Sequence, residues 1–229
     1  MESTEKAHPI SLLGTRSEGT FWRKELYPNY LKRFFDLLLS VLLLPLAIPI
    51  LAVMYFMIKL DSKGPVLYKS ERMGKDGKKF YIYKFRTMVL DAEAKLTELL
   101  EKNPELKREW EIDHKLRKDP RVTRVGKIIR ALSLDELPQL WNVAKGEMSF
   151  VGPRPIVEAE VQKYGKYFRI YKSVKPGITG LWQVNGRNDI SYEARINFDK
   201  HYVEKMSFPL DLLIMGKTIP VALSKKGAY

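Results

Sequence analysis

The stretch that decides the fold runs from Leu37 to Ile58 and reads LLLSVLLLPLAIPILAVMYFMI. Its 22 residues carry no charge. As a straight helix they would extend roughly 33 Å, enough for a hydrocarbon core of about 30 Å. A buried core helix is the plainest alternative, but globular helices rarely stay apolar on every side over such a length. A secretory signal is a poor match, because the run is long and follows a polar leader.

The middle and the flanks of this stretch argue against a simple crossing of the membrane. Pro45 and Pro49 each remove a backbone donor and disfavour a straight helix. Basic residues lie on both sides, whereas a crossing helix usually has its excess of Lys and Arg on one side. They are Arg23, Lys24, Lys32 and Arg33 before the run, and Lys59, Lys63, Lys69, Arg72, Lys75 and Lys78 after it. We therefore expect a re-entrant helical hairpin over residues 31–60 that bends at the prolines and returns to the same face. A full crossing stays open as the alternative.

The composition indicates a globular chain with an acidic partner. The 229 residues are 45% hydrophobic and 29% charged, which excludes a disordered or collagen-like chain. The net charge is +13, and such an excess favours nucleic acid, phosphate-bearing ligands or an anionic membrane surface. The absence of cysteine excludes disulfides, a Cys-ligated zinc site and a thiol nucleophile. Three histidines leave little material for a His-rich metal site or a Ser-His-Asp triad.

After Leu60 the chain is amphipathic, without repeats or a long linker. The fold class that we predict is α+β, mainly helical, with a membrane helix and interfacial amphipathic helices. The expected elements are strands over 66–69 and 79–88, two helices between 89 and 116, and helices over 122–131, 157–171, 191–206 and 208–223. A further helix should begin near Ser133 and end at Gly146. The apolar segment 208–223 suits either the core or the membrane interface.

Two adjacent carboxylates, Asp135 and Glu136, are the first chemical candidates. One interpretation is structural: Ser133 as N-cap and Glu136 three residues later make a capping box, with Asp135 at the positive end of the helix. The functional interpretation uses the same placement, because a helix N-terminus binds anions. A carboxylate there binds Mg²⁺ or attacks a phosphoryl group. Glycoside hydrolysis fits less well, since its carboxylates must flank the bond about 5 Å or more apart.

Basic residues gather in sequence around this pair. Residues 115–130 hold seven of them against a single acid. Arg154 lies between two prolines, Arg187 lies in an Asn-Gly-Arg-Asn loop, and Lys84 and Arg86 belong to an aromatic strand. Arginine suits bidentate contact with phosphate and lysine supplies a point charge. Any one of these cations alone is most simply a solvated surface residue, but together they predict phosphate binding. The sequence has no Walker loop, GxGxxG motif or zinc-ligand spacing.

Taken together, these motifs resemble the bacterial monotopic phosphoglycosyl transferases, the bacterial sugar transferase family. The matching stretches run in family order over about residues 30–223. They are LKRFFDLLLS, YIYKFRTM, VGKIIRALSLDELPQLWNVAKGEMSFVGPRP, KPGITGLWQVNGRN and FDKHYVEKMSFPLDL. Many members have a Ser-Pro pair at the hairpin break, where this chain has Ile48-Pro49 and an extra Pro45. Larger members carry a membrane bundle and a further soluble domain, so this chain is similar to the minimal catalytic form.

The resemblance implies an activity. Members transfer a sugar-1-phosphate from a UDP-sugar to undecaprenyl phosphate and release UMP, with Mg²⁺ as cofactor. The implied route is ping-pong, through a phosphosugar held covalently on Asp135. Glu136 is implied as the second member of the dyad, which positions the metal or assists the acceptor, so both carboxylates are candidate metal ligands. The implied step is the first membrane step in making a surface polysaccharide or glycoconjugate.

The substrate-binding candidates combine the family positions with Arg86 from the aromatic strand. They are Lys84, Arg86, Arg130, Arg154, Arg187 and Asp199. The domain layout that we expect is a polar leader over 1–30, the re-entrant helix over 31–60 and a catalytic domain over 61–229. The resemblance places the catalytic domain on the cytoplasmic face of the bacterial inner membrane.

The expected partners are a UDP-sugar, undecaprenyl phosphate and inner-membrane lipid, with downstream glycosyltransferases as further candidates. A non-catalytic membrane scaffold for glycan assembly is the alternative function, although such a scaffold should have lost the dyad or the loop arginines. A membrane-bound nucleic-acid-binding protein is a weaker rival, because no recognition motif accompanies the basic stretch. We therefore expect no nucleic acid among the partners.

Overall fold

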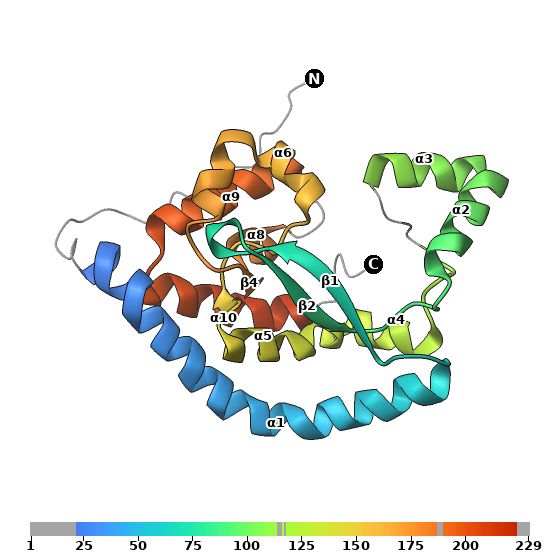
Figure 1. Ribbon diagram of the computed structural model, residues 1–229, viewed down its shortest axis with the longest axis horizontal. Coiled ribbons are helices and arrows are strands. Elements are labelled where there is room, and N and C mark those ends of the chain that lie inside the picture. The colour runs from blue at the N-terminus through green and yellow to red at the C-terminus, as the bar shows by residue number, and fades with distance from the viewer. Residues whose placement is uncertain (1–21, 114–115, 117, 187–189, 224–229) are drawn as a thin grey trace.

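The computed structural model describes residues 22–113, 116, 118–186 and 190–223. These residues form a mainly helical structure, as the sequence predicts, together with two small sheets (Figure 1). The strands are β1 (Leu67–Met73), β2 (Lys79–Phe85), β3 (Ser149–Val151) and β4 (Gly177–Thr179). The α-helices are α1 (Lys32–Asp61), α2 (Ala92–Lys102), α3 (Pro104–Asp113), α4 (Arg124–Ala131), α5 (Leu140–Lys145), α6 (Val161–Tyr164), α7 (Phe168–Tyr171), α8 (Leu181–Asn185), α9 (Tyr192–Lys205) and α10 (Phe208–Leu223). The remaining helical turns are η2 (Trp22–Leu31), η3 (Lys75–Gly77), η4 (Leu134–Gln139), η5 (Glu158–Glu160) and η6 (Gly165–Tyr167).

Helix α1 is one continuous helix of 30 residues that contains both Pro45 and Pro49. It curves along one side of the molecule as an arc, and its two ends lie against the rest of the protein (Figure 1). Each proline removes one backbone hydrogen bond and pushes the preceding turn outward, which bends a helix. The expected bend is therefore present as a curve within one helix, rather than as a break between two helices.

The surface of α1 is apolar and largely uncovered. Only 17% of its most apolar 18-residue window is buried, and it is the one described helix that is long and apolar enough to cross a membrane. Its exposed large side chains are Phe34, Leu37, Leu38, Val41, Leu42, Leu43, Leu46, Ile48, Ile50, Val53, Tyr55, Phe56 and Leu60. A buried core helix would have these side chains covered by protein, so that alternative is wrong. Such a surface is compatible with membrane association.

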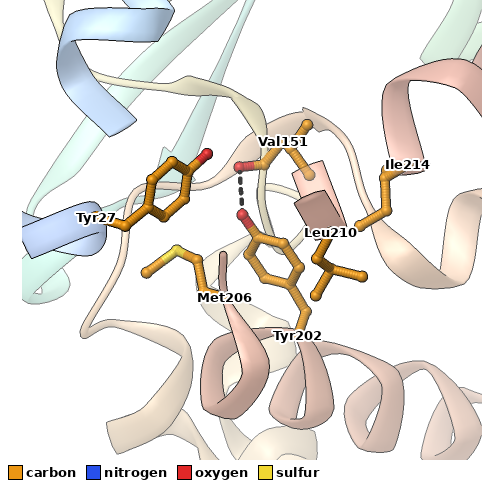
Figure 2. Close-up of a cluster of buried hydrophobic side chains, with 6 residues drawn as sticks. All are labelled: Tyr27, Val151, Tyr202, Met206, Leu210 and Ile214. Atoms are coloured by element: carbon orange, nitrogen blue, oxygen red, sulfur yellow. Dashed lines mark hydrogen bonds between the residues drawn. The ribbon is translucent and has the colours of Figure 1, made fainter. Parts of the chain in front are cut away.

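The N-terminal end of α1 lies beside a buried cluster that joins distant parts of the chain. Its side chains come from η2, β3, α9, α10 and the link between these two helices, and they pack around one centre (Figure 2): Tyr27, Val151, Tyr202, Met206, Leu210 and Ile214. The Tyr202 hydroxyl donates to the Val151 carbonyl at 3.1 Å. Tyr27 is only 5% exposed, so η2 contributes this side chain to the core. The polar leader expected over 1–30 is thus part of the fold from Trp22 onward, and residues 1–21 lie outside the described part.

Buried polar groups fasten α1 at the same end. The Asp211 carboxylate accepts hydrogen bonds from the Tyr27 hydroxyl at 2.6 Å, from the Tyr202 hydroxyl at 2.8 Å and from the Lys32 ammonium group. One helical turn further, Asp36 accepts from the Ser149 hydroxyl at 2.9 Å. Both carboxylates are buried, and the charge of Asp211 is compensated by its partners. The start of α1 is therefore held in one position on β3, α9 and α10.

The C-terminal half of α1 packs against the hairpin of β1 and β2. Met54 and Ile58 form a buried cluster with Val66, Phe85 and Ile129, which brings α4 into the same contact. The hairpin is antiparallel and its register runs from Leu67 opposite Phe85 to Met73 opposite Lys79. β3 and β4 make a second, parallel pair. The two ends of α1 thus contact the part of the molecule that carries the candidate residues.

Some expected elements differ from the observed ones. The first strand continues to Met73, beyond the expected end at residue 69. The helix expected over 157–171 is divided into four short pieces, and Gly165, the first residue of η6, has φ of +49°, which no regular helix allows. Helix α10 has the expected bounds, and its Leu210 and Ile214 side chains are buried in the core whereas Leu212 and other apolar residues are exposed.

Candidate active site

The two carboxylates lie on η4, a short 3₁₀ helix, and not at the N-terminus of a regular helix. Ser133 has φ of +55° in the left-handed region, and its side chain makes no capping hydrogen bond. The capping box is therefore wrong. The physical reason is that the Glu136 carboxylate accepts its hydrogen bonds from cations of other elements instead of from the local backbone. Since η4 is too short for a helix dipole, side-chain charges must supply the positive field.

Asn142 holds this segment against β2. Its side-chain amide donates to the Tyr81 carbonyl at 2.7 Å, and its amide oxygen accepts from the Tyr83 backbone N–H at 3.2 Å. Asn142 is fully buried and thus satisfies two backbone groups of β2 that would otherwise lack partners. The amide of one α5 residue therefore sets the position of η4 relative to Lys84 on the same strand.

Two cations converge on Glu136. The Lys84 ammonium group lies 2.6 Å from Glu136 Oε1 and 3.9 Å from Asp135 Oδ2. Arg154 Nη1, from the loop after β3, lies 3.4 Å from the same Glu136 oxygen. The side chains of Asp135, Glu136 and Lys84 are 17–19% exposed, so they are largely enclosed yet reachable. Lys84, the Asp135–Glu136 pair and Arg154 are far apart in the sequence and are brought together here.

The environment separates the two carboxylates electrostatically. Burial raises the pKa of Asp135, and the nearby Lys84 charge offsets this only in part. Burial would also raise the pKa of Glu136, but the charges of Lys84 and Arg154 outweigh it and hold this pKa well below its usual value. Glu136 therefore stays ionised and paired, whereas the Asp135 carboxylate is the less compensated of the two. Neighbouring carboxylates with divergent pKa values are a common sign of divided chemical roles.

Arg130 approaches Asp135 from α4. A side chain at Gly126 would collide with the Thr87 carbonyl, its Cβ only 2.2 Å away, so the glycine lets α4 lie close to the end of β2. Arg130 then donates from Nε to the Thr87 hydroxyl at 2.8 Å. Burial lowers the pKa of Arg130, and the negative charge of Asp135 opposes this shift. Arg130 is therefore a third cation in the field of the dyad.

The structure does not bring every candidate to the dyad. Arg86 donates to the carbonyls of Ser62 and Lys63, each at 2.8 Å, and so anchors the end of α1. This contact leaves its predicted substrate-binding role without structural support. Asp199 is 2% exposed on α9 and accepts from the Tyr164 hydroxyl at 2.8 Å, and burial raises its pKa to about 7. It is a core residue here. The predicted site residue at 187 lies outside the described part.

A small hollow beside the dyad contains one cation that sequence reasoning treated only as a flanking charge. The residues that line it are Arg72, Ile82, Lys84, Glu136, Gln139, Arg154, Pro155, Gly177 and Ile178. Arg72 comes from β1, where Tyr68 pairs with Lys84 and Arg72 pairs with Phe80. Alternate residues of a strand share one face, so Arg72 and Lys84 point to the same side of the hairpin. The alternation of side chains along β1, combined with the register of the β1–β2 hairpin, is the signal that could have identified Arg72 as a site residue.

The dyad suits a magnesium ion that is shared with a phosphate ligand. Among the described residues there is no group of three or more His, Asp and Glu side chains that would hold a metal alone. Mg²⁺, however, is usually bound by one or two carboxylates together with substrate phosphates and water. Asp135 and Glu136 are adjacent, partly exposed carboxylates of that kind. The residues present therefore fit this cofactor when a phosphate supplies the remaining ligands.

This arrangement, a carboxylate dyad among cations beside an apolar helix, agrees with the comparison with known sequences. The sequence pattern of the family described as "Bacterial sugar transferase" matches residues 27–225, so the chain belongs to this family.

Several curated relatives are similar to it. The "UDP-galactose-lipid carrier transferase" of Erwinia amylovora is 50% identical over 201 residues, which cover 88% of this chain and 42% of the relative. The "Undecaprenyl-phosphate galactose phosphotransferase" of Salmonella typhimurium is 48% identical over the same shares. The "Exopolysaccharide production protein ExoY" of Sinorhizobium fredii is 45% identical over 86% of this chain and 88% of the relative. This chain thus spans less than half of the length of the first two relatives.

Proposed function

We propose that this protein transfers a sugar-1-phosphate from a UDP-sugar to undecaprenyl phosphate and releases UMP. The observation that carries the proposal is the carboxylate dyad beside Lys84 and Arg154, of which Glu136 and the two cations line a small hollow. It has the charges that a diphosphate donor requires, and Asp135, the less compensated of the two carboxylates, is available for attack. The printed names of two relatives, a galactose phosphotransferase acting on undecaprenyl phosphate and a UDP-galactose-lipid carrier transferase, support the same reaction.

The proposed chemistry proceeds in two displacements. An Asp135 oxygen attacks the sugar-bearing phosphorus of the donor, and the bond from this phosphorus to UMP breaks, so that UMP leaves with the electron pair. A phosphate oxygen of undecaprenyl phosphate then attacks the same phosphorus, and the bond to Asp135 breaks, which restores the carboxylate. Glu136 stays ionised and holds Lys84 and Arg154 where negative charge develops on the phosphoryl oxygens. Asp135 and Glu136 would hold Mg²⁺, which neutralises part of the diphosphate charge when bound.

The proposed location is the cytoplasmic face of the bacterial inner membrane, with α1 re-entering one leaflet. The curve of α1 directs both of its ends toward the catalytic part, as a re-entrant segment requires (Figure 1). Both flanks are basic, which favours contact with anionic headgroups on one side. Exposed apolar side chains of the helices beside α1, including Ile128 and Trp141, suit an interfacial position. Membrane lipid and downstream glycosyltransferases are the proposed partners at that surface.

Labelling of introduced cysteines tests this topology directly, because the chain contains no cysteine of its own. Tyr30→Cys and Lys63→Cys place single thiols at exposed positions on either side of α1. A membrane-impermeant maleimide should label neither position in intact cells and both after permeabilisation. If one of the two thiols reacts from outside in intact cells, α1 crosses the membrane and the re-entrant topology is wrong.

The reaction is tested by UMP release from a panel of UDP-sugars with purified protein and Mg²⁺. Release from one donor that depends on undecaprenyl phosphate is the expected result, and it also identifies the sugar. A stoichiometric burst of UMP without acceptor would support the covalent intermediate. If no donor in a broad panel released UMP, the non-catalytic scaffold would become the better reading.

Arg154→Ala should reduce transfer without abolishing it. Removal of one preorganised electrostatic contact to a developing charge costs about 10²–10³ in rate, and Glu136 loses one of its two cationic partners as well. The measurement is initial-rate kinetics of UMP release at saturating donor. Arg169→Ala is the matched control, because Arg169 is exposed on α7. Equal rates for the Arg154 variant and the wild-type chain would remove Arg154 from the site.

A further inference from the structure

We propose that Arg72 binds the phosphate of the nucleoside monophosphate that leaves when Asp135 is loaded. The inference rests on the proposed function and deepens it, since it divides the donor's two phosphates between different cations. Arg72 lies in the hollow that contains Lys84, Glu136 and Arg154, and it reaches that hollow from β1.

The pairing state of Arg72 distinguishes it from the other two cations of the hollow. Lys84 and Arg154 both contact Glu136, so their charges are already compensated in part. No ion pair of Arg72 is found among the described residues, and its buried Nε has no hydrogen-bond partner there. A buried donor without a partner is costly and rare in native proteins. An anion that enters the hollow would supply the missing partner.

The repulsion between Arg72 and Arg154 points in the same direction. Burial lowers the pKa of Arg72 and the positive charge of Arg154 lowers it further, while the negative charge of Glu160 opposes this shift in part. Two guanidinium groups held near each other repel unless an anion lies between them. A phosphate, which accepts bidentate hydrogen bonds from arginine, is the anion that suits both groups.

The contacts of the three cations with the carboxylates indicate which phosphate of the donor lies at Arg72. Lys84 contacts both carboxylates, Arg154 contacts only Glu136, and Arg72 makes no contact with either carboxylate. Arg72 therefore lies farther from Asp135 than Lys84 does. The phosphorus attacked by Asp135 must lie next to this carboxylate. The second phosphate of the donor, which leaves as part of UMP, then falls toward Arg72.

The two half-reactions separate this role from a merely structural one. In Arg72→Gln, the second-order rate constant for the loading of Asp135 from a UDP-sugar, measured in single turnovers, should fall about 10- to 100-fold. This is the loss expected for one charge-assisted hydrogen bond. The dissociation constant of UMP, measured by calorimetry, should rise by a similar factor. The rate at which preloaded enzyme reacts with undecaprenyl phosphate should not change, because UMP has already left. Arg72→Lys should recover part of the loss.

Lys69→Gln is the matched control, because Lys69 lies on the same strand but on the opposite face, stacked over the Tyr83 ring. It should match the wild-type chain in both half-reactions. If Arg72→Gln bound UMP as tightly as the wild-type chain, or slowed both half-reactions equally, the assignment of Arg72 would be overturned. If the wild-type chain itself released no UMP from any donor, the proposed function would fail, which is a different outcome.

Discussion

Asp135→Asn should abolish transfer and leave no phosphosugar on the protein. The substitution keeps the shape of the side chain but replaces the attacking carboxylate oxygen with a neutral amide. Removal of a covalent nucleophile costs on the order of 10⁴–10⁶ in rate, the largest effect that we expect for any single substitution here. The measurements are UMP release under multiple-turnover conditions and intact-protein mass after incubation with donor alone.

Two comparisons make the result interpretable. Asp91→Asn removes an exposed carboxylate next to α2 that pairs with Lys95, and it should leave both readouts unchanged. Glu136→Gln should slow the reaction while still forming the adduct, because Lys84 and Arg154 would lose their shared carboxylate but Asp135 would remain. Near-wild-type turnover of Asp135→Asn would exclude the covalent mechanism, whatever the other variants do.

Asp211→Ala should produce the largest loss of stability. Its carboxylate is 3% exposed and accepts three hydrogen bonds, one of them from the buried Lys32 ammonium group. Removal of one partner of a buried ion pair leaves an uncompensated charge and costs about 3–5 kcal/mol. Thermal unfolding of the detergent-solubilised protein, followed by tryptophan fluorescence, should show a strongly lowered midpoint. The docking of α1 on α10 should loosen at the same time.

A paired substitution separates the lost charge from the lost packing. Lys32→Met together with Asp211→Leu removes both charges and fills the space with apolar groups, so it should restore most of the stability. Glu204→Ala is the surface control, because the Lys200–Glu204 pair is exposed and such pairs contribute about 0–1 kcal/mol. An Asp211→Ala midpoint close to that of Glu204→Ala would show that the buried network contributes little.

Lys84 and Arg86 show the limit of what a local sequence pattern predicts about side-chain contacts. The two residues are separated by two positions in one aromatic stretch, so strand alternation predicts that both face the same way. β2, however, ends at Phe85, and beyond it the chain turns toward the end of α1. Arg86 therefore meets the carbonyls of Ser62 and Lys63 while Lys84 meets Glu136.

The interpretation of Glu136 likewise depended on a contact with a residue distant in the sequence. Within the segment around it, a capping box and a catalytic dyad are equally consistent with the residues. The contact with Lys84, 52 positions away in the sequence, separates the two interpretations. Arg72 was hidden for a related reason, since its relation to Lys84 depends on the register of the β1–β2 hairpin.

The sequence by itself determined the long apolar helix, the mainly helical class and the carboxylate pair as the chemical candidate. These features follow from composition and short-range periodicity, because burial of apolar side chains and backbone geometry act over a few residues. Only the tertiary structure decided which cations surround Asp135 and which carboxylate is compensated. Charges interact through space and not along the chain, so their partners are known only once distant segments have been packed together.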